Sequence, residues 1–188
     1  MTDFLTANYS DNQESSYDAL PTGEYEMIIN RASETATKNG AESLQIDLIV
    51  RNDLDKVPSL LETNAKYHNR HVFNDNWKRK KTGQYDMQSF QYILQAVGVP
   101  EGTRIATIDD FINALVGKPV KVYVKKEDNE YNGEITKVNR VAPWNYSKTN
   151  FTNVQHALKN ESSGSNSNDP FDRQSGKPID IQDSDLPF

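Results

Sequence analysis

Apolar and polar residues alternate in two segments near the start of the chain, residues 24–30 and residues 44–50. A period of two is typical of a strand that buries one face. The dipeptide Asn39-Gly40 lies between these segments and predicts a hairpin turn, because both residue types tolerate positive φ. Residues 66–73 alternate more weakly and predict a third strand.

The period lengthens in the middle of the chain. Residues 87–97 and 108–116 each repeat apolar side chains at the three- and four-residue spacing of a helix. Asp86 is placed to cap the first of these, and Thr107 with Asp110 forms a capping-box pattern at the start of the second. We therefore predict two short helices after the third strand.

A second hairpin is expected after the helices. Residues 120–124 and 134–141 alternate again, and Asp128-Asn129 predicts the tight turn that leads into the last strand. Three strands, a helical segment and two strands follow the order of the oligonucleotide/oligosaccharide-binding (OB) fold. We predict a mainly β protein with short helices, a five-stranded OB-fold-like barrel with its helical insert between strands 3 and 4. Other small α+β sheets fit the same order.

Composition divides the 188 residues into three parts. After Asn160 the chain is dominated by Ser, Asn, Asp, Gly and Pro, which bury too little apolar surface to offset the entropy lost on ordering. We predict a leader at 1–19, an OB-fold-like nucleic-acid-binding domain at 20–148 and a disordered, flexible tail at 149–188. The net charge is −6, but residues 21–149 hold 18 basic against 17 acidic groups, so a basic surface patch is not excluded.

Several kinds of chemistry are not expected. The chain has no Cys, and His68 and His71 would point to opposite faces of the predicted third strand, so we predict no metal site. Neither a glycine-rich phosphate loop nor a catalytic constellation is present, so we expect no cofactor and no enzyme activity. No stretch approaches the roughly 20 apolar residues of a membrane helix. We therefore expect a cytoplasmic protein with no membrane partner.

Aromatic residues are interleaved with cations between residues 67 and 81. Binding of single-stranded nucleic acid uses flat rings on which bases stack and cations that meet phosphates. The candidates are Tyr67, Arg70, His71, Phe73, Trp77, Lys78, Arg79, Lys80 and Lys81. The alternative is that residues 78–81 form a solvated loop with Trp77 as its apolar anchor.

A second candidate group follows the helices. Lys121, Tyr123 and Lys125 should share the outward face of the fourth strand, and Arg140 lies near the same hairpin. In an OB barrel the loop between the last two strands borders the binding groove on strands 2 and 3. The alternative is that the lysines keep an exposed strand edge soluble.

The last residues combine acidic and apolar side chains and predict a partner-binding segment, which we call the tip. Phe188 can fill an apolar pocket while the aspartates lie along a basic ridge of a partner. The candidate partner-binding residues are Asp183, Asp185, Leu186, Pro187 and Phe188.

Two resemblances bear on these residues. The tip, Asp-Ser-Asp-Leu-Pro-Phe at 183–188, resembles the acidic end of bacterial single-stranded-DNA-binding proteins, which recruits replication and repair partners. Leu-Pro-Thr-Gly-Glu-Tyr at 20–25 and Gly-Lys-Pro-Val-Lys-Val at 117–122 resemble a family of phage-encoded, single-stranded-DNA-binding-like proteins. Members of that family sit in replication or recombination modules. The resemblance therefore implies single-stranded DNA and phage or host proteins as partners.

The leading hypothesis is a phage protein of the bacterial host cytoplasm that coats single-stranded DNA in replication or recombination and recruits partners through its tip. The second is an adaptor that binds proteins through the tail and has no DNA affinity of its own. The third, a nuclease, would need a cluster of acids to hold Mg²⁺, and no such spacing is present. A homo-oligomer stays open, because an exposed strand edge could pair two copies or be covered by the leader.

Overall fold

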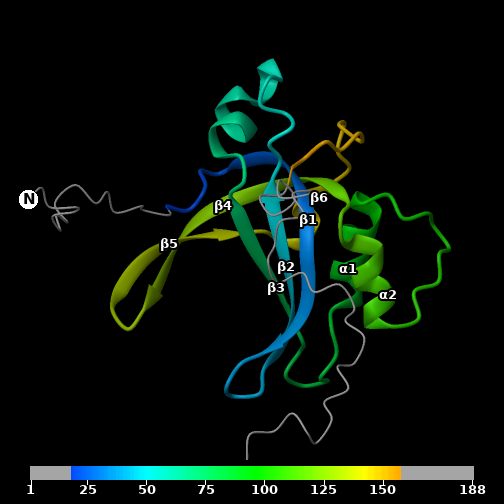
Figure 1. Cartoon of the computed structure of the whole chain (residues 1–188). Coiled ribbons are helices and arrows are strands. Elements are labelled where there is room, and N and C mark those ends of the chain that lie inside the picture. Colours follow the sequence, from blue (N-terminus) through cyan, green and yellow to red (C-terminus); the bar gives the residue numbers. More distant parts are fainter. Residues whose placement is uncertain (1–17, 158–188) are drawn as a thin grey trace, which may run out of the picture. The chain divides into compact units, whose positions relative to one another are not determined.

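An antiparallel sheet forms the frame of the protein (Figure 1). The computed structural model describes residues 18–157, so the tip and residues 1–17 lie outside the described part. The strands are β1 (Gly23–Ala36), β2 (Glu42–Val50), β3 (His71–Trp77), β4 (Pro119–Tyr131), β5 (Glu134–Arg140) and β6 (Tyr146–Ser147). The helices are α1 (Met87–Ala96) and α2 (Ile108–Leu115), with short turns η1 (Pro58–Leu60), η2 (Leu61–Ala65) and η3 (Pro143–Asn145).

The strand order is β3-β2-β1-β4-β5, and each neighbouring pair is antiparallel. β6 pairs with the first part of β4, whereas β5 pairs with the second part. β3 and β5 do not pair, so the sheet stays unclosed. The predicted fold class is confirmed: the protein is mainly antiparallel β with short helices between its third and fourth strands, in an OB-like arrangement.

The core lies between the inner face of the sheet and the two helices. Met27 and Ile29 of β1 and Leu48 of β2 are fully buried there. Phe90 of α1 stacks on Phe111 of α2 with ring centroids 4.3 Å apart. Burying each such side chain contributes about 1.5–3 kcal/mol, so the helices hold one side of the open barrel together.

β1 has a neighbouring strand on each edge and bends along its length. Its first part pairs with β4 and its second part pairs with β2, and the register shifts between Ile29 and Arg31. This β-bulge inserts Asn30 as an extra residue, which increases the local twist and lets one strand curl around the core. Arg31 therefore faces outward, although a strict period of two from Met27 and Ile29 would turn it inward.

Both helices begin where capping residues predict. The Asp86 side chain accepts a hydrogen bond from the backbone N–H of Gln88, and Thr107 with Asp110 forms both bonds of a capping box. α1 has 10 residues and α2 has 8. No helix within residues 18–157 is long and apolar enough to cross a membrane.

The predicted third strand begins too early. Residues 61–67 are helical, and β3 starts only at His71. The reason is Asn64, which is fully buried and bonds the backbone of Glu26 and Arg51, so its segment is tied to β1 in a helical turn. His68 consequently lies in a turn beside Asp55 instead of on a strand, which corrects the predicted opposition of His68 and His71.

The predicted turn at Asp128-Asn129 is also wrong. β4 continues to Tyr131, and the hairpin turns at Asn132-Gly133, whose φ angles are 53° and 82°. A two-residue loop with both φ angles positive matches the twist of the flanking strands, and Asn-Gly is the pair that adopts it most easily. The result is a long β4–β5 arm, defined as residues 125–140, that extends from the frame (Figure 1).

Gly133→Ala should lower stability by about 1 kcal/mol, because a side chain at its φ of 82° is strained although nothing lies within 4 Å of the added Cβ. Gly23→Ala is the matched control, since its Cβ would make an ordinary 3.8 Å contact with Tyr25 at an unstrained φ. Thermal unfolding followed by circular dichroism should show a lower Tm for Gly133→Ala alone. Equal Tm values for the two variants would contradict the strain.

Residues 149–156, assigned from composition to the start of the tail, lie against the domain, and we call them the strap. Arg51 is fully buried and donates to both carboxylate oxygens of Asp53, at 2.9 and 2.5 Å. It also donates to the backbone carbonyls of Phe151 and Asn153, at 2.5 and 2.7 Å. One buried guanidinium therefore joins the end of β2 to a segment about 100 residues later in the chain.

A candidate nucleic-acid interface on strand β3

The outward face of β3 carries exposed aromatic side chains. Alternation along the strand buries Val72 and Asn74 and turns His71, Phe73 and Trp77 outward. Phe73 is 56% exposed and Trp77 is 49% exposed. His71 and Phe73 lie on a strand as predicted, whereas Trp77, predicted to follow the strand, is its last residue, and the structure brings all three onto one face.

Hydrogen bonds hold the ring of His71 in place. His71 stacks on Phe73 with ring centroids 6.1 Å apart and planes 16° from parallel. The Nδ1 atom of His71 lies 2.7 Å from Oδ1 of Asp47, and Asn30 donates to the other carboxylate oxygen at 2.7 Å. Asp47 is the cross-strand neighbour of Phe73, so this network lies beside the stacked rings. We call the stacked rings of His71 and Phe73 the platform.

Arg31 is a cation beside this platform that sequence reasoning missed. It is exposed, and it is the cross-strand neighbour of Asp47 on β1. No ion pair within 4.0 Å is present for it in the described part of the chain. The bulge at Asn30 shifts the alternation, and a strict period of two therefore does not identify Arg31 as a residue of this face.

Two of the predicted cations after Trp77 have structural partners. Lys78 contacts Glu42 at 2.7 Å and Glu34 at 3.5 Å, and its ammonium lies 5.0 Å from the centre of the Tyr85 ring. The hydrogen bond to Glu42 raises the pKa of Lys78. Arg79 pairs with Asp86 at 3.0 Å, so neither cation is free to meet phosphate without losing a partner.

Lys80 and Lys81 differ from these neighbours. Both are exposed in the loop that follows Trp77, and neither has an ion pair in residues 18–157. They are the cations of the predicted segment that can turn toward a bound phosphate without breaking a contact. Within residues 78–81, Lys78 and Arg79 are therefore held in ion pairs, whereas Lys80 and Lys81 remain available to contact phosphate.

Tyr67 and Arg70 are not on the strand that was predicted to carry them. Tyr67 is half-buried and packs edge-on against Tyr25, with ring centroids 6.2 Å apart. Arg70 precedes β3, and its guanidinium donates to the backbone carbonyl of Asp18. These contacts tie both side chains to the domain, so we leave them out of the interface.

The second predicted group lies on another part of the surface. Tyr123 is 40% exposed on the outward face of β4, with Lys121 and Lys125 beside it. β1 and β2 separate β4 from β3, so at about 4.8 Å per strand the two rows are about 14 Å apart across the sheet. The structure therefore does not bring the two predicted groups together.

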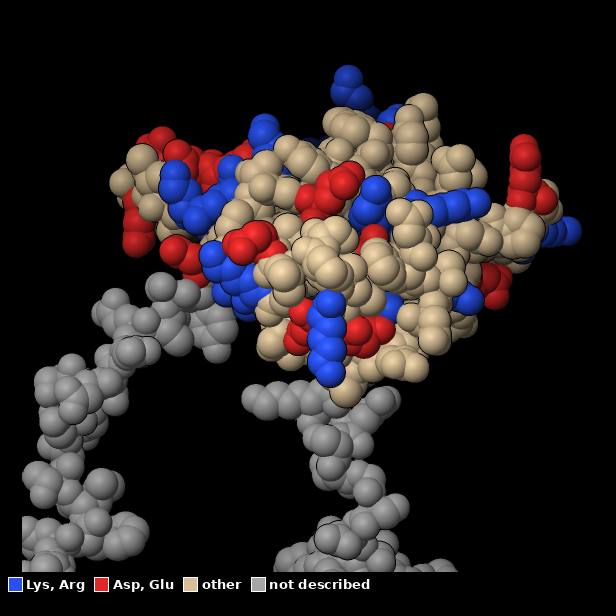
Figure 2. Space-filling view, turned by 90° about the horizontal axis from the view of Figure 1, so that it is seen from above, with Lys and Arg blue, Asp and Glu red and all other residues tan. Residues whose placement is uncertain are grey.

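Acidic neighbours also compensate this second group. Lys121 lies 3.6 Å from Glu24, Lys125 lies 2.6 Å from Glu127, and Arg140 lies 3.5 Å from the same Glu127. Figure 2 shows basic and acidic side chains mixed over the β4–β5 arm, at the left of the view. The arm therefore presents no basic patch, although Tyr131 and Ile135 near its end are 73% and 66% exposed.

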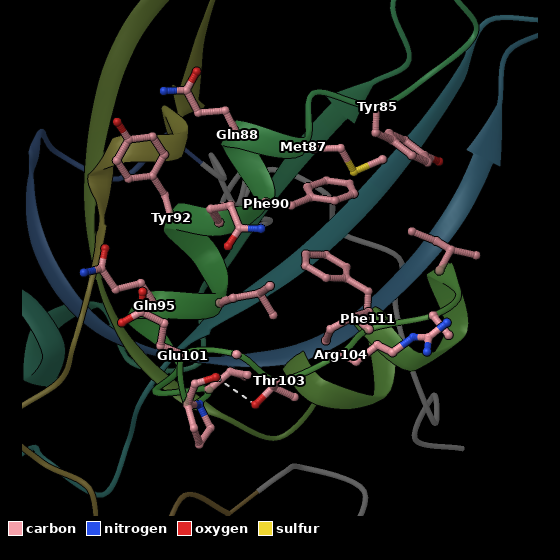
Figure 3. A pocket seen from close by; sticks show the side chains of 18 of the residues that line it. Tyr85, Met87, Gln88, Phe90, Tyr92, Gln95, Glu101, Thr103, Arg104 and Phe111 are labelled. Carbon is pink, nitrogen blue, oxygen red and sulfur yellow. Dashed lines mark hydrogen bonds between the residues drawn. The ribbon is translucent and has the colours of Figure 1, made fainter.

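A hollow of about 1020 Å³ lies on the helical side of the molecule (Figure 3). Phe90 and Phe111 form part of its floor, and Met87 and Tyr92 of α1 project beside it. The segment joining α1 to α2 forms its other wall, with Arg104 at one end. It is separate from the platform on β3, since none of the β3 residues lines it.

The fold and surface define an OB-like β protein that displays aromatic side chains on an outer strand. The chain belongs to the family described as "Protein of unknown function (DUF669)", which matches residues 7–162. No curated protein matches the chain. A solved structure titled "Yeast RPA bound to ssDNA" aligns over 79% of this chain and 91% of that chain, with a TM-score of 0.34 and 8% identity, a loose likeness of shape.

Proposed function

We propose that this protein binds single-stranded DNA across the outward face of β2 and β3. In this proposal it is a phage protein that coats single strands during replication or recombination in the cytoplasm of a bacterial host. Phe73 and Trp77 stack on bases, while Arg31, Lys80 and Lys81 meet the phosphates. Asp47 holds His71, and His71 stacks on Phe73, so the ring of Phe73 is already oriented before DNA arrives.

The exposure of Phe73 and Trp77 carries this proposal. Two large rings lie on one face of a strand at the end of the sheet, each about half exposed. Burial would have stabilised the fold, so their exposure calls for a ligand with its own flat apolar faces. Every nucleobase has such a face, and each stacked base is worth about 1–3 kcal/mol.

Electrostatics should contribute less than stacking. Three cations near the platform have no ion pair in the described residues, and Asp47 and Asp75 lie on the same face. For single strands the logarithm of affinity falls by about 0.7 per phosphate neutralised for each tenfold rise in salt. We therefore expect a shallow salt dependence, with a slope of about −2.

Fluorescence anisotropy with a labelled pyrimidine oligomer tests the proposal. The full chain should bind the single strand with the slope given above and should bind a duplex of equal length much more weakly, because paired bases cannot stack on the rings. Tryptophan fluorescence should be quenched in the same titration. Absence of binding at low salt, or equal binding of the duplex, would refute the proposal.

Partner recruitment through the tip is a further part of the proposal. Asp183, Asp185, Leu186, Pro187 and Phe188 lie outside the described residues, so the support comes from their pattern of charge and apolar character. The adaptor without DNA affinity remains the second candidate, because the mixed charges of the β4–β5 arm offer phosphate little attraction. The anisotropy titration distinguishes the DNA-binding protein from the adaptor, because only the first binds the labelled single strand.

A further inference from the structure

The seam between β3 and the last strand contains a slot. β5 ends at Arg140 and β6 begins at Tyr146, and the turn η3 interrupts the strand that would face β3. A cavity of about 190 Å³ lies in this seam, between residues 74–77 of β3, the start of α1, and Val141 with Pro143. A space of this volume is large enough for one flat ring system.

The β3 wall of the slot presents backbone hydrogen-bonding groups. The N–H of Val50 donates to the carbonyl of Arg70, and the N–H of Lys78 donates to the carbonyl of Glu42. In an antiparallel ladder this pairing alternates, so Asp75 and Trp77 turn their backbone N–H and C=O groups away from β2. β3 is the last strand on that side of the sheet, and no described strand pairs with this edge.

A neutral hydrogen bond lies on the inner side of the slot. Asn74, one of the lining residues, donates through Nδ2 to the hydroxyl of Tyr146 at 2.7 Å, and both side chains are buried. Burial raises the pKa of Tyr146, so the hydroxyl stays protonated. On the outer side Trp77, whose side chain is half-exposed, lines the same cavity.

The chemistry of the walls restricts the occupant. An apolar side chain would remove water from the backbone edge of β3 and leave those groups without partners, which costs about 1–3 kcal/mol for each group. A phosphate would be repelled by Asp75 and Asp86, which both line the slot, and the hydrogen bond from Arg79 lowers the pKa of Asp86 and keeps it ionised. A flat, uncharged ring with donors and acceptors at its edge satisfies both restrictions.

We propose that this slot receives one nucleobase of a bound single strand, turned out beside Trp77, and that it selects a base with an exocyclic amino group. Carboxylates accept hydrogen bonds from the amino group of cytosine, whereas thymine offers an acceptor at that position. Asp75 is the residue that discriminates in this proposal, because it lines the slot and Gln45, which donates to Oδ1 of its carboxylate at 3.0 Å, leaves Oδ2 available to a base. This inference rests on the proposed binding of single-stranded DNA.

Two oligomers of the shortest binding length test the slot with the full chain: all dT, and dT with one central dC. The wild-type chain should bind the dC-containing oligomer about fivefold to tenfold more tightly. Asp75→Asn should reduce this ratio to below about twofold, because an amide can donate to thymine. Ser89→Leu, which fills the slot from α1, should also abolish the preference while stacking on Phe73 continues.

Gln91→Leu is the matched control, because Gln91 lies on the same helix but lines the larger hollow and not the slot. It should keep the preference of the wild-type chain. If neither oligomer binds, the proposed function fails and this inference falls with it. If both bind equally to the wild-type chain, or if the preference survives in both slot variants, the slot is refuted while DNA binding stands.

Discussion

Replacing Phe73 and Trp77 together by alanine is expected to reduce the affinity for single-stranded DNA by about 100-fold. Each ring offers a stacking surface worth about 1–3 kcal/mol, and a factor of ten in affinity corresponds to about 1.4 kcal/mol. The stability of the fold should change little, because both side chains are about half exposed and project from the outward face of β3. Anisotropy titrations and thermal unfolding of the same samples measure the two quantities.

Tyr92→Ala is the control for this pair of substitutions. Tyr92 is also partly exposed, at 37%, but it lies beside the hollow on α1 (Figure 3). Its removal should leave the DNA affinity within about twofold of the wild-type value. The proposed stacking of bases on Phe73 and Trp77 would be refuted if the double variant, still folded, bound DNA within about threefold of the wild-type chain.

Arg51→Ala should destabilise the fold by about 3–5 kcal/mol, the largest effect on stability that we expect from one substitution. The variant leaves the carboxylate of Asp53 buried without its cation, and it removes the donors to the carbonyls of Phe151 and Asn153. The strap should therefore detach from the end of β2. Urea unfolding measures the loss, and native-state hydrogen exchange of residues 149–156 should show the strap opening first.

Lys125→Ala is the matched control, because it breaks an ion pair of similar length, 2.6 Å, that is exposed to solvent. It should leave the unfolding midpoint unchanged, since water solvates the remaining carboxylate of Glu127 after Lys125 is replaced. An unchanged midpoint for Arg51→Ala as well would show that the strap does not depend on the buried guanidinium.

The same cluster makes the fold sensitive to acid. Burial alone would raise the pKa of Asp53, but hydrogen bonds from Arg51 and from the backbone N–H of Gln155 outweigh it, and the pKa is lowered. A carboxyl with a lowered folded pKa contributes stability that is complete above its unfolded pKa of about 4 and is lost as the pH falls through the folded value. Wild-type stability should therefore fall below about pH 4, and less steeply in Asp53→Asn.

Local patterns in the chain were sufficient for most of the elements. The Asn39-Gly40 turn, the helix start at Asp86 and the capping box at Thr107 depend on residues within four positions of one another, so they can be identified without the rest of the fold. The order of these elements also predicted the OB-like arrangement. The alternation of residues 66–73 placed His71 and Phe73 on a strand for the same reason, because the side-chain period of a strand is local, whereas the extension of that strand to Trp77 was not predicted.

The remaining features depend on contacts between distant parts of the chain. Asn64 holds the segment before β3 in a helical turn because its amide bonds the backbone of β1, 38 residues away, and Tyr67 leaves the interface as a result. Arg31 joins the platform only because a bulge in β1 shifts its register against β2. The ion pairs of Lys78 and Lys125, and the slot between β3 and Pro143, arise only when the folded sheet brings these residues together. The sequence by itself therefore determined both helices and most of the strands, because their patterns are local, whereas the tertiary structure alone decided which aromatic side chains share one face, which cations stay available and where the barrel stays open.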